Sequence, residues 1–310
     1  MSAELYRDPV YDGATDPKVV IDPAGGWWML YTQRRATHPA PGPGVAWVHG
    51  SRIGVARSGD GVQWSYAGTL EPDAGGLTLR AGRPPESVDV THWAPEVIHD
   101  GVQWRMYLTE IDGVPDRWPG FARHIVEYRS DDLEHWSGRG HIPLSSDRVI
   151  DAAVARTPDG RWRFWAKDEA ADSVTTVAVS EDLETWRGDG IAIGGRAHEG
   201  PDVFELSGFW WMIVDEWRGM AVYRSPDAVS WERQGGPDEV ILGLGAVAGP
   251  GFGHHGAAVR DGETVWFYYF GHPARAYVPD AATDSIDDRL CAVYRARLIV
   301  TRGRLEVADR

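Results

Sequence analysis

One seven-residue pattern, Ser-x-Asp-x-x-x-Trp, occurs four times in this chain with the same internal spacing. The copies are Ser58–Trp64, Ser130–Trp136, Ser180–Trp186 and Ser225–Trp231. A second pattern, a short aromatic segment, recurs five times, as Trp27–Tyr31, Trp104–Tyr107, Trp162–Trp165, Trp210–Val214 and Trp266–Phe270. Repetition on this scale indicates a supersecondary unit that stacks on copies of itself.

A short β-branched segment precedes each aromatic segment and predicts an inner strand. The five inner segments cover residues 18–21, 96–98, 153–155, 202–204 and 256–259, and their aligned valines lie 49 to 78 residues apart. A four-stranded propeller blade needs about 40–50 residues, so the excess is expected in long loops. The longest are predicted at 36–50, 71–92 and 272–288, where they could wall off one end of a channel.

These repeats predict an all-β chain with one domain over residues 1–310. The expected fold is a five-bladed β-propeller with four-stranded antiparallel blades around a central channel. The 37 Gly and 16 Trp of the chain agree, because glycines mark turns and aromatic residues favour strands. A β-sandwich is the alternative, but a sandwich does not need five similar units.

Charge and composition exclude several classes of partner. The chain has 31 basic and 46 acidic residues, a net charge of −15, which argues against nucleic acid and anionic membranes. One cysteine, Cys291, excludes an intramolecular disulfide. The first residues lack the basic and apolar regions of a signal peptide, so a cytoplasmic location is expected. Homo-oligomer formation stays open.

Polar residues stand just before the predicted inner strands. Because the same ends of the inner strands meet at one mouth of a propeller channel, these residues are expected to converge. They include the carboxylates Asp16, Asp151 and Glu199, together with Trp93, His198, His254 and His255. Carboxylates in different environments suit the hydrolysis of a glycosidic bond, where one acts as acid and one as base.

The set of motifs resembles the five-bladed β-propeller glycosidases of glycoside hydrolase family 43. The motifs are Asp16-Pro17, Trp93-Ala-Pro-Glu96, Ile150-Asp151, Glu199-Gly-Pro201 and Gly253-His254, one for each predicted blade. The resemblance implies that Asp16 is the general base and Glu199 the general acid. It implies that Asp151 tunes the pKa of Glu199, and like-charge repulsion from Asp151 is expected to raise that pKa.

Further residues are expected to contact the sugar. They are Trp93, Glu96, His198, Trp217 and His255, where Glu96 replaces an Asp that is frequent in family 43. The chain is also similar to family 117 enzymes, which act on agar-derived disaccharides, and that similarity makes His198 a rival acid. No cofactor is expected to be required. His254 resembles the histidine through which family 43 enzymes hold a calcium or sodium ion in the channel.

The function predicted from the sequence is that of an inverting, exo-acting glycoside hydrolase. Its expected substrate is an oligosaccharide that ends in a furanoside or an unusual pentose or galactose-type sugar. Three alternatives stay open: a carbohydrate-binding propeller without catalysis, a family 117-like anhydrogalactosidase with a histidine acid, and a related enzyme such as a retaining fructosidase or a phosphorolytic mannosidase.

Overall fold

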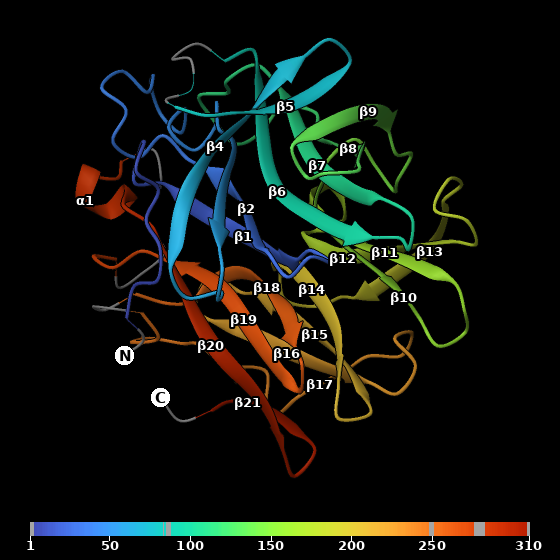
Figure 1. Cartoon of the computed structure of the whole chain (residues 1–310). Coiled ribbons are helices and arrows are strands. Elements are labelled where there is room, and N and C mark those ends of the chain that lie inside the picture. Colours follow the sequence, from blue (N-terminus) through green and yellow to red (C-terminus); the bar gives the residue numbers. More distant parts are fainter. Residues whose placement is uncertain (1–2, 83, 85–87, 248–250, 276–282, 309–310) are drawn as a thin grey trace.

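The repeated units fold into antiparallel meanders of four strands, which follow one another along the chain (Figure 1). The computed structural model describes residues 3–82, 84, 88–247, 251–275 and 283–308. The first meander contains β1 (Ala14–Ile21), β2 (Trp27–Gln33), β3 (Arg52–Ser58) and β4 (Trp64–Asp73), and the second contains β6 (Val90–His99), β7 (Trp104–Asp112), β8 (His124–Ser130) and β9 (His135–His141). The third contains β10 (Val149–Arg156), β11 (Trp162–Asp168), β12 (Val174–Ser180) and β13 (Arg187–Ile193). The fourth contains β14 (Glu199–Leu206), β15 (Phe209–Asp215), β16 (Met220–Ser225) and β17 (Glu232–Arg233), and the fifth contains β18 (His254–Asp261), β19 (Thr264–Gly271), β20 (Ala292–Thr301) and β21 (Arg304–Val307).

One extra strand modifies this pattern. β5 (Gly76–Arg80) pairs with both β4 and β9, so the first two meanders form one nine-stranded sheet. The segment 71–92, predicted as a long loop, is therefore partly strand, and residues 83 and 85–87 of it lie outside the described part. Helices are limited to η1 (Glu169–Ala171) and α1 (Ile286–Arg289) within the described residues. None of them could cross a membrane.

The five inner strands form a closed ring. β1, β6, β10, β14 and β18 contain the five segments predicted as inner strands, and each strand contacts the next, with β18 returning to β1 (Figure 1). The segment that precedes β1 also contacts the fifth meander, because the Leu5 amide donates to the Val293 carbonyl of β20 (2.8 Å). This contact joins the two ends of the chain's described part where the ring closes.

The hydrophobic core is divided among the interfaces between neighbouring meanders. The tryptophan of each Ser-x-Asp turn contributes to one such interface. Trp136 packs with residues of the first two meanders, and Trp186 contacts Tyr107 of the second meander edge to face. Trp64 contacts Tyr268 of the fifth meander in the same way, and Trp231 contacts Trp165 of the third. Aromatic packing therefore joins the repeats around the ring.

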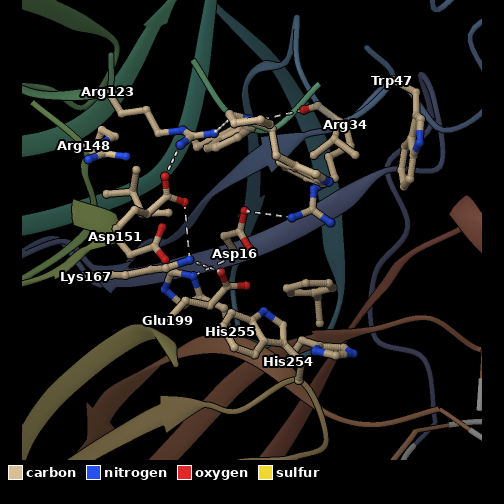
Figure 2. Close-up of a pocket in the computed structure, with 18 of the residues that line it drawn as sticks. Asp16, Arg34, Trp47, Arg123, Arg148, Asp151, Lys167, Glu199, His254 and His255 are labelled. Carbon is tan, nitrogen blue, oxygen red and sulfur yellow. Dashed lines mark hydrogen bonds and ion pairs between the residues drawn. The ribbon is translucent and has the colours of Figure 1, made fainter. Parts of the chain in front are cut away.

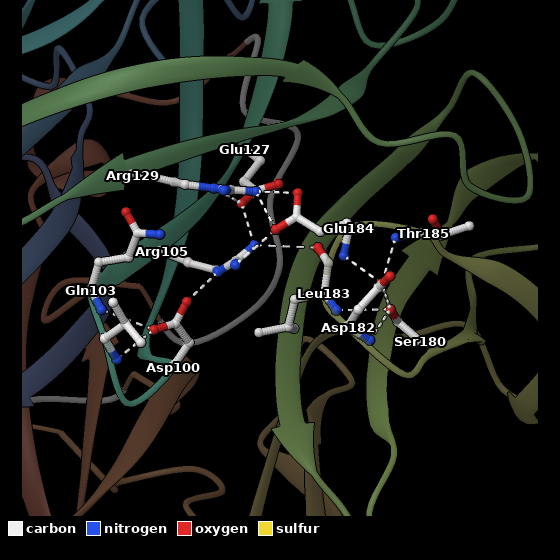
Figure 3. A network of polar contacts seen from close by, with 11 residues as sticks. Asp100, Gln103, Arg105, Glu127, Arg129, Ser180, Asp182, Leu183, Glu184 and Thr185 are labelled. Atoms are coloured by element: carbon white, nitrogen blue, oxygen red, sulfur yellow. Dashed lines mark hydrogen bonds and ion pairs between the residues drawn. The ribbon is translucent and has the colours of Figure 1, made fainter.

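A buried arginine network reinforces one of these interfaces (Figure 3). The guanidinium of Arg105, on β7, donates to Asp100 (2.7 Å) and Glu127 (2.8 Å) of its own meander. It also donates to Glu184 (2.9 Å) in the Ser-x-Asp turn of the third meander. In that turn, Asp182 accepts the backbone N–H groups of Glu184 and Thr185, as an Asp in a tight turn does. The turn thus presents Glu184 to the neighbouring meander.

Candidate active site

Every inner strand begins with a bulge at the same structural position. The pairing register shifts between Thr15 and Lys18 in β1, and at the equivalent places in the other four inner strands. The bulge residues Asp16, Ala94, Asp151 and Gly200 have positive φ angles of 49°, 45°, 59° and 58°. Left-handed backbone is costly for residues other than glycine and clusters at functional sites, and bulges redirect side chains. The repeated bulge therefore directs side chains from several meanders toward one point.

That point is a pocket of about 600 Å³ (Figure 2). It is lined by seven of the residues predicted from the sequence, namely Asp16, Trp93, Asp151, Glu199, Trp217, His254 and His255. Three carboxylates from three meanders thus face one cavity. Glu96 and His198, which were also predicted, do not line it.

Asp16 lies on the first meander's side of the pocket and is nearly buried. Its Oδ2 atom accepts a hydrogen bond from the Thr15 hydroxyl (3.2 Å), and the same atom lies 3.9 Å from Nη2 of Arg34. Its Oδ1 atom lies 3.7 Å from Nδ1 of His255. A guanidinium and an imidazole from two other positions therefore flank this carboxylate.

Glu199 forms an ion pair with Lys167. The Nζ atom of Lys167, on β11, lies 3.0 Å from Oε2 of Glu199 and 3.6 Å from Glu169. Burial opposes ionisation of Glu199, but the charge and hydrogen bond of Lys167 outweigh burial and lower the pKa of Glu199 well below its ordinary value. The expectation that Asp151 raises this pKa is therefore corrected, because a cation that was not foreseen sits against the carboxylate.

Asp151 is the carboxyl group whose pKa is raised. Burial, reinforced by the charge of Glu199 and opposed by His255, raises the pKa of Asp151 from 3.8 to about 7. Its Oδ2 atom accepts the backbone N–H of Gly200 (3.1 Å), the residue that follows Glu199. The two carboxyl groups are thus pushed apart in pKa, which is the pattern expected of an acid–base pair.

His255 stands among these carboxylates. Burial opposes its charge, but Asp151, Asp16 and Glu199 together raise the pKa of the imidazole. The ring packs on the backbone of Gly200, where an added Cβ would lie 2.4 Å from Cγ of His255. The glycine of the Glu-Gly-Pro sequence therefore leaves room for this imidazole.

Glu96 lies outside the pocket and belongs to a separate layer of the channel. Its Oε2 atom is 2.6 Å from Nζ of Lys18, and Oε1 accepts the backbone N–H of Val154 (3.2 Å). Lys18 also lies 3.8 Å from Asp202. Glu96 is two residues beyond the bulge residue Ala94, so its side chain joins this buried ion cluster instead of the predicted sugar contact.

His198 is fully buried and has both ring nitrogens occupied. Nδ1 donates to the Arg196 carbonyl (2.8 Å), so Nε2 accepts from the Thr175 hydroxyl (2.7 Å). Burial lowers the pKa of His198, which keeps the ring neutral. The predictions that His198 contacts the sugar or acts as an acid are therefore wrong.

His254 lines the pocket and forms a hydrogen bond with a buried carboxylate. Nδ1 donates to Oδ2 of Asp215 (2.9 Å), and the ring stacks on Phe270. Among the described residues, no group of three or more His, Cys, Asp or Glu side chains is placed to hold a metal ion. The predicted calcium or sodium ion would need several oxygen ligands, and this histidine does not supply them.

The two predicted tryptophans form part of the pocket wall. The indole N–H of Trp93 donates to the Val48 carbonyl (3.1 Å). The ring of Trp217 lies 5.3 Å from Nζ of Lys167. Both rings are held by neighbours, and Trp93 is buried against His49 and Trp118.

Other residues of the pocket wall were not predicted from the sequence. They include Arg34, Trp47, Trp118, Arg123, Arg148, Lys167 and Arg275. One signal was available: the chain contains two lysines, Lys18 and Lys167, and all its other basic residues are arginines. Both lysines lie in ion pairs of the channel.

Comparisons with known proteins agree with this fold. No family model matches the sequence, and no curated protein matches it. Solved structures do match: a thermostable family-43 glycoside hydrolase is 17% identical with a TM-score of 0.67, over 98% of this chain and 96% of that one. A xylan β-1,4-xylosidase from Bacillus halodurans C-125 is 16% identical with a TM-score of 0.67, over 98% of this chain but only 56% of its own length.

A third structure is a family-43 β-xylosidase/α-arabinofuranosidase from a compost microbial metagenome, in complex with xylotriose and in calcium-free form. It is 13% identical with a TM-score of 0.65, over 99% of this chain and 97% of that one. The resemblance predicted from the sequence is thus confirmed at the level of structure. The chain has the fold of the family-43 glycoside hydrolases.

Proposed function

We propose that this chain is a five-bladed propeller glycoside hydrolase that inverts the anomeric centre of its substrate. One observation carries the proposal: Asp16, Asp151 and Glu199, from three meanders, line one pocket in three different electrostatic environments. A structural surface has no need of such an arrangement, whereas hydrolysis of a glycoside needs an ionised base and a protonated acid together.

The proposed chemistry uses one water molecule. Asp16 takes a proton from this water, whose oxygen attacks the anomeric carbon, and the bond from that carbon to the leaving oxygen breaks. Glu199 gives a proton to the leaving oxygen. The place of Asp16 on the pocket wall, beside Arg34 and His255, supports its role as the base.

Differences in burial and in pKa support different roles for the carboxyl groups of Glu199 and Asp151. The side chain of Glu199 is partly exposed, whereas Asp151 is buried, so Glu199 is the one that can reach a leaving group. Asp151 holds the pair's proton in the free protein, because its pKa is the raised one. We infer that Asp151 gives this proton to the Glu199 carboxylate before bond cleavage, so that Asp151 becomes ionised and Glu199 becomes the protonated acid.

The shape of the pocket supports action on a chain end. Trp47 and Val48, from the predicted loop 36–50, line it, as do His272 and Arg275 from the predicted loop 272–288. Residues 276–282 of the second loop lie outside the described part. A terminal furanoside, pentose or galactose-type sugar is the proposed substrate, in line with the xylosidase and arabinofuranosidase names of the matching structures. No cofactor enters the proposed reaction.

A carbohydrate-binding protein without catalysis is the second candidate. The Lys167–Glu199 ion pair favours it, since a carboxylate held in an ion pair is a weak acid. Hydrolysis of a panel of aryl pentosides and hexosides separates the two functions. A glycosidase releases the phenol from at least one of them, and Asp16→Asn abolishes the release. Binding of sugars without turnover of any member of the panel would establish the second candidate.

A further inference from the structure

The wall of the pocket carries more positive than negative side chains, although the chain as a whole is acidic. The cationic side chains of the wall are Arg34, Arg123, Arg148, Lys167 and Arg275, and the carboxylates are Asp16, Asp151, Glu169 and Glu199. The whole chain, by contrast, contains 31 basic and 46 acidic residues. The excess is one charge, so whether this wall attracts an anion depends on which of these cations are already paired with carboxylates of the protein.

Three of these cations are engaged by carboxylates. Arg123 pairs with Glu169, and Lys167 pairs with Glu199. Arg275 pairs with Asp284. These pairs hold the wall together, and their charges are largely compensated.

Arg34 is not engaged in this way. Among the described residues no hydrogen bond to its side chain is present, and its closest carboxylate oxygen, on Asp16, is 3.9 Å away. That distance is too long for a hydrogen bond. Its Nε atom is buried without a partner, and the guanidinium lies 5.3 Å from the centre of the Phe270 ring. Buried donors are nearly always satisfied, so an unpartnered one at a pocket calls for an explanation.

Arg148 shows the same lack of a partner at the mouth of the pocket. Its side chain is exposed, and it forms no ion pair with any residue that the structure describes. Figure 2 places Arg148 on the other side of the cavity from Arg34, with the three carboxylates between them. Two guanidinium groups that form no hydrogen bond with a carboxylate of the described residues therefore line the pocket in which a sugar would bind.

We infer that the sugar bound in this pocket carries an anionic substituent, either the carboxylate of a uronic acid or a sulfate ester, and that Arg34 binds it. A planar guanidinium with free donors matches such oxygens in a bidentate manner, and the tryptophans of the wall supply stacking surfaces for the ring. This inference rests on the proposed function for the orientation of the sugar, but its test is a binding measurement that needs no turnover.

The test compares matched hexoses by ligand-detected NMR titration of the full chain at low ionic strength. D-galacturonic acid and D-galactose 6-sulfate are compared with D-galactose, and D-glucuronic acid with D-glucose. We expect at least one anionic sugar to bind about tenfold or more tightly than its neutral counterpart, because a hydrogen-bonded charge pair is worth that factor. A preference for the acids indicates a uronic acid, and a preference for the sulfate indicates a sulfate ester.

Arg34→Met should abolish this preference, and Arg34→Lys should retain part of it. The control Arg80→Met, which removes an exposed cation outside the pocket, should keep it in full. If Arg34→Met does not fold, two other measurements take its place. The preference should weaken in Arg34→Lys, and the preference of the unaltered protein should be lost in high salt. Equal binding of neutral and anionic sugars, binding of none of them, or a preference that survives Arg34→Met would overturn the inference. Tight binding of an acid, together with no hydrolysis of its aryl glycoside, would instead support it and refute the proposed enzyme.

Discussion

The Nζ atom of Lys167 lies 3.0 Å from Oε2 of Glu199, on the wall of the pocket that Asp151 also lines. In the register of the third meander, Lys167 is paired with Ile150, just before the bulge at Asp151. Thr32, Thr109 and Asp215 occupy the equivalent place in three other meanders. A position that holds a short side chain in three meanders, and Phe270 in the fifth, thus holds a cation beside the proposed acid.

This ion pair predicts how the pH profile responds to its removal. Lys167 lowers the pKa of both Glu199 and Asp151, so Lys167→Met should raise both. The basic limb of the profile of kcat/KM against pH reports loss of the acid's proton, and it should move to higher pH by about one to three units. Lys167→Arg keeps the charge and should leave the limb close to its original position. A limb that does not move in the methionine variant would show that Lys167 does not control the acid.

The raised pKa of Asp151 predicts a pH-dependent stability. The folded protein binds this proton up to a pH of about 7, whereas the unfolded chain releases it near 3.8. The group therefore stabilises the fold below pH 3.8, and this contribution is lost as the pH rises toward 7. Glu199 acts in the opposite direction, but its contribution is complete above its ordinary pKa of 4.5.

Asp151→Asn tests this relationship. The Tm of the variant, relative to that of the unaltered protein, should increase between about pH 4 and pH 7 and then level off. Thermal unfolding by circular dichroism across that range measures the difference. A difference that stays constant with pH would mean that Asp151 ionises normally in the folded protein.

The network around Arg105 predicts a large effect on stability. Arg105 is buried and bonds to Asp100, Glu127 and Glu184. Arg105→Met leaves the buried carboxylate of Asp100 without its guanidinium partner, whereas Glu127 and Glu184 keep Arg129. We expect a loss of about 3–5 kcal/mol in the free energy of unfolding. The matched variant Arg80→Met breaks an exposed pair with Asp73 and should cost about 0–1 kcal/mol. Urea unfolding gives both values, and similar values for the two variants would contradict this account of the interface.

The sequence repeat was sufficient to locate the inner strands, because each repeat folds as one meander and the bulge falls at the same place in each. Asp16, Asp151 and Glu199 were found for that reason. The repeat could not separate the layers of the channel: Glu96 is two residues past its bulge and pairs with Lys18 in a deeper layer. His198 is next to Glu199 in sequence, yet its ring points into a separate set of buried hydrogen bonds.

Residues contributed by second strands and loops were not predicted, since no repeat marks them. Lys167 and Arg34 reach the pocket from the ends of β11 and β2, where pairing register decides which side chain faces the channel. The number of lysines was the one hint in the sequence. Lys167 lowers the pKa of Glu199 below that of Asp151, so this order of the two pKa values could not be predicted without the structure.

The measurement that tests the central claim most directly is the dependence of Glu199→Gln activity on the leaving group. Rates are compared on a phenyl glycoside and on the 2,4-dinitrophenyl glycoside of the same sugar. Removal of a general acid should cost roughly 10²–10⁴-fold on the first substrate and much less on the second, whose leaving group needs no proton. Asp16→Asn should be impaired on both, because water activation is still lost. Equal losses of Glu199→Gln on the two substrates would contradict the assignment of Glu199 as the proton donor.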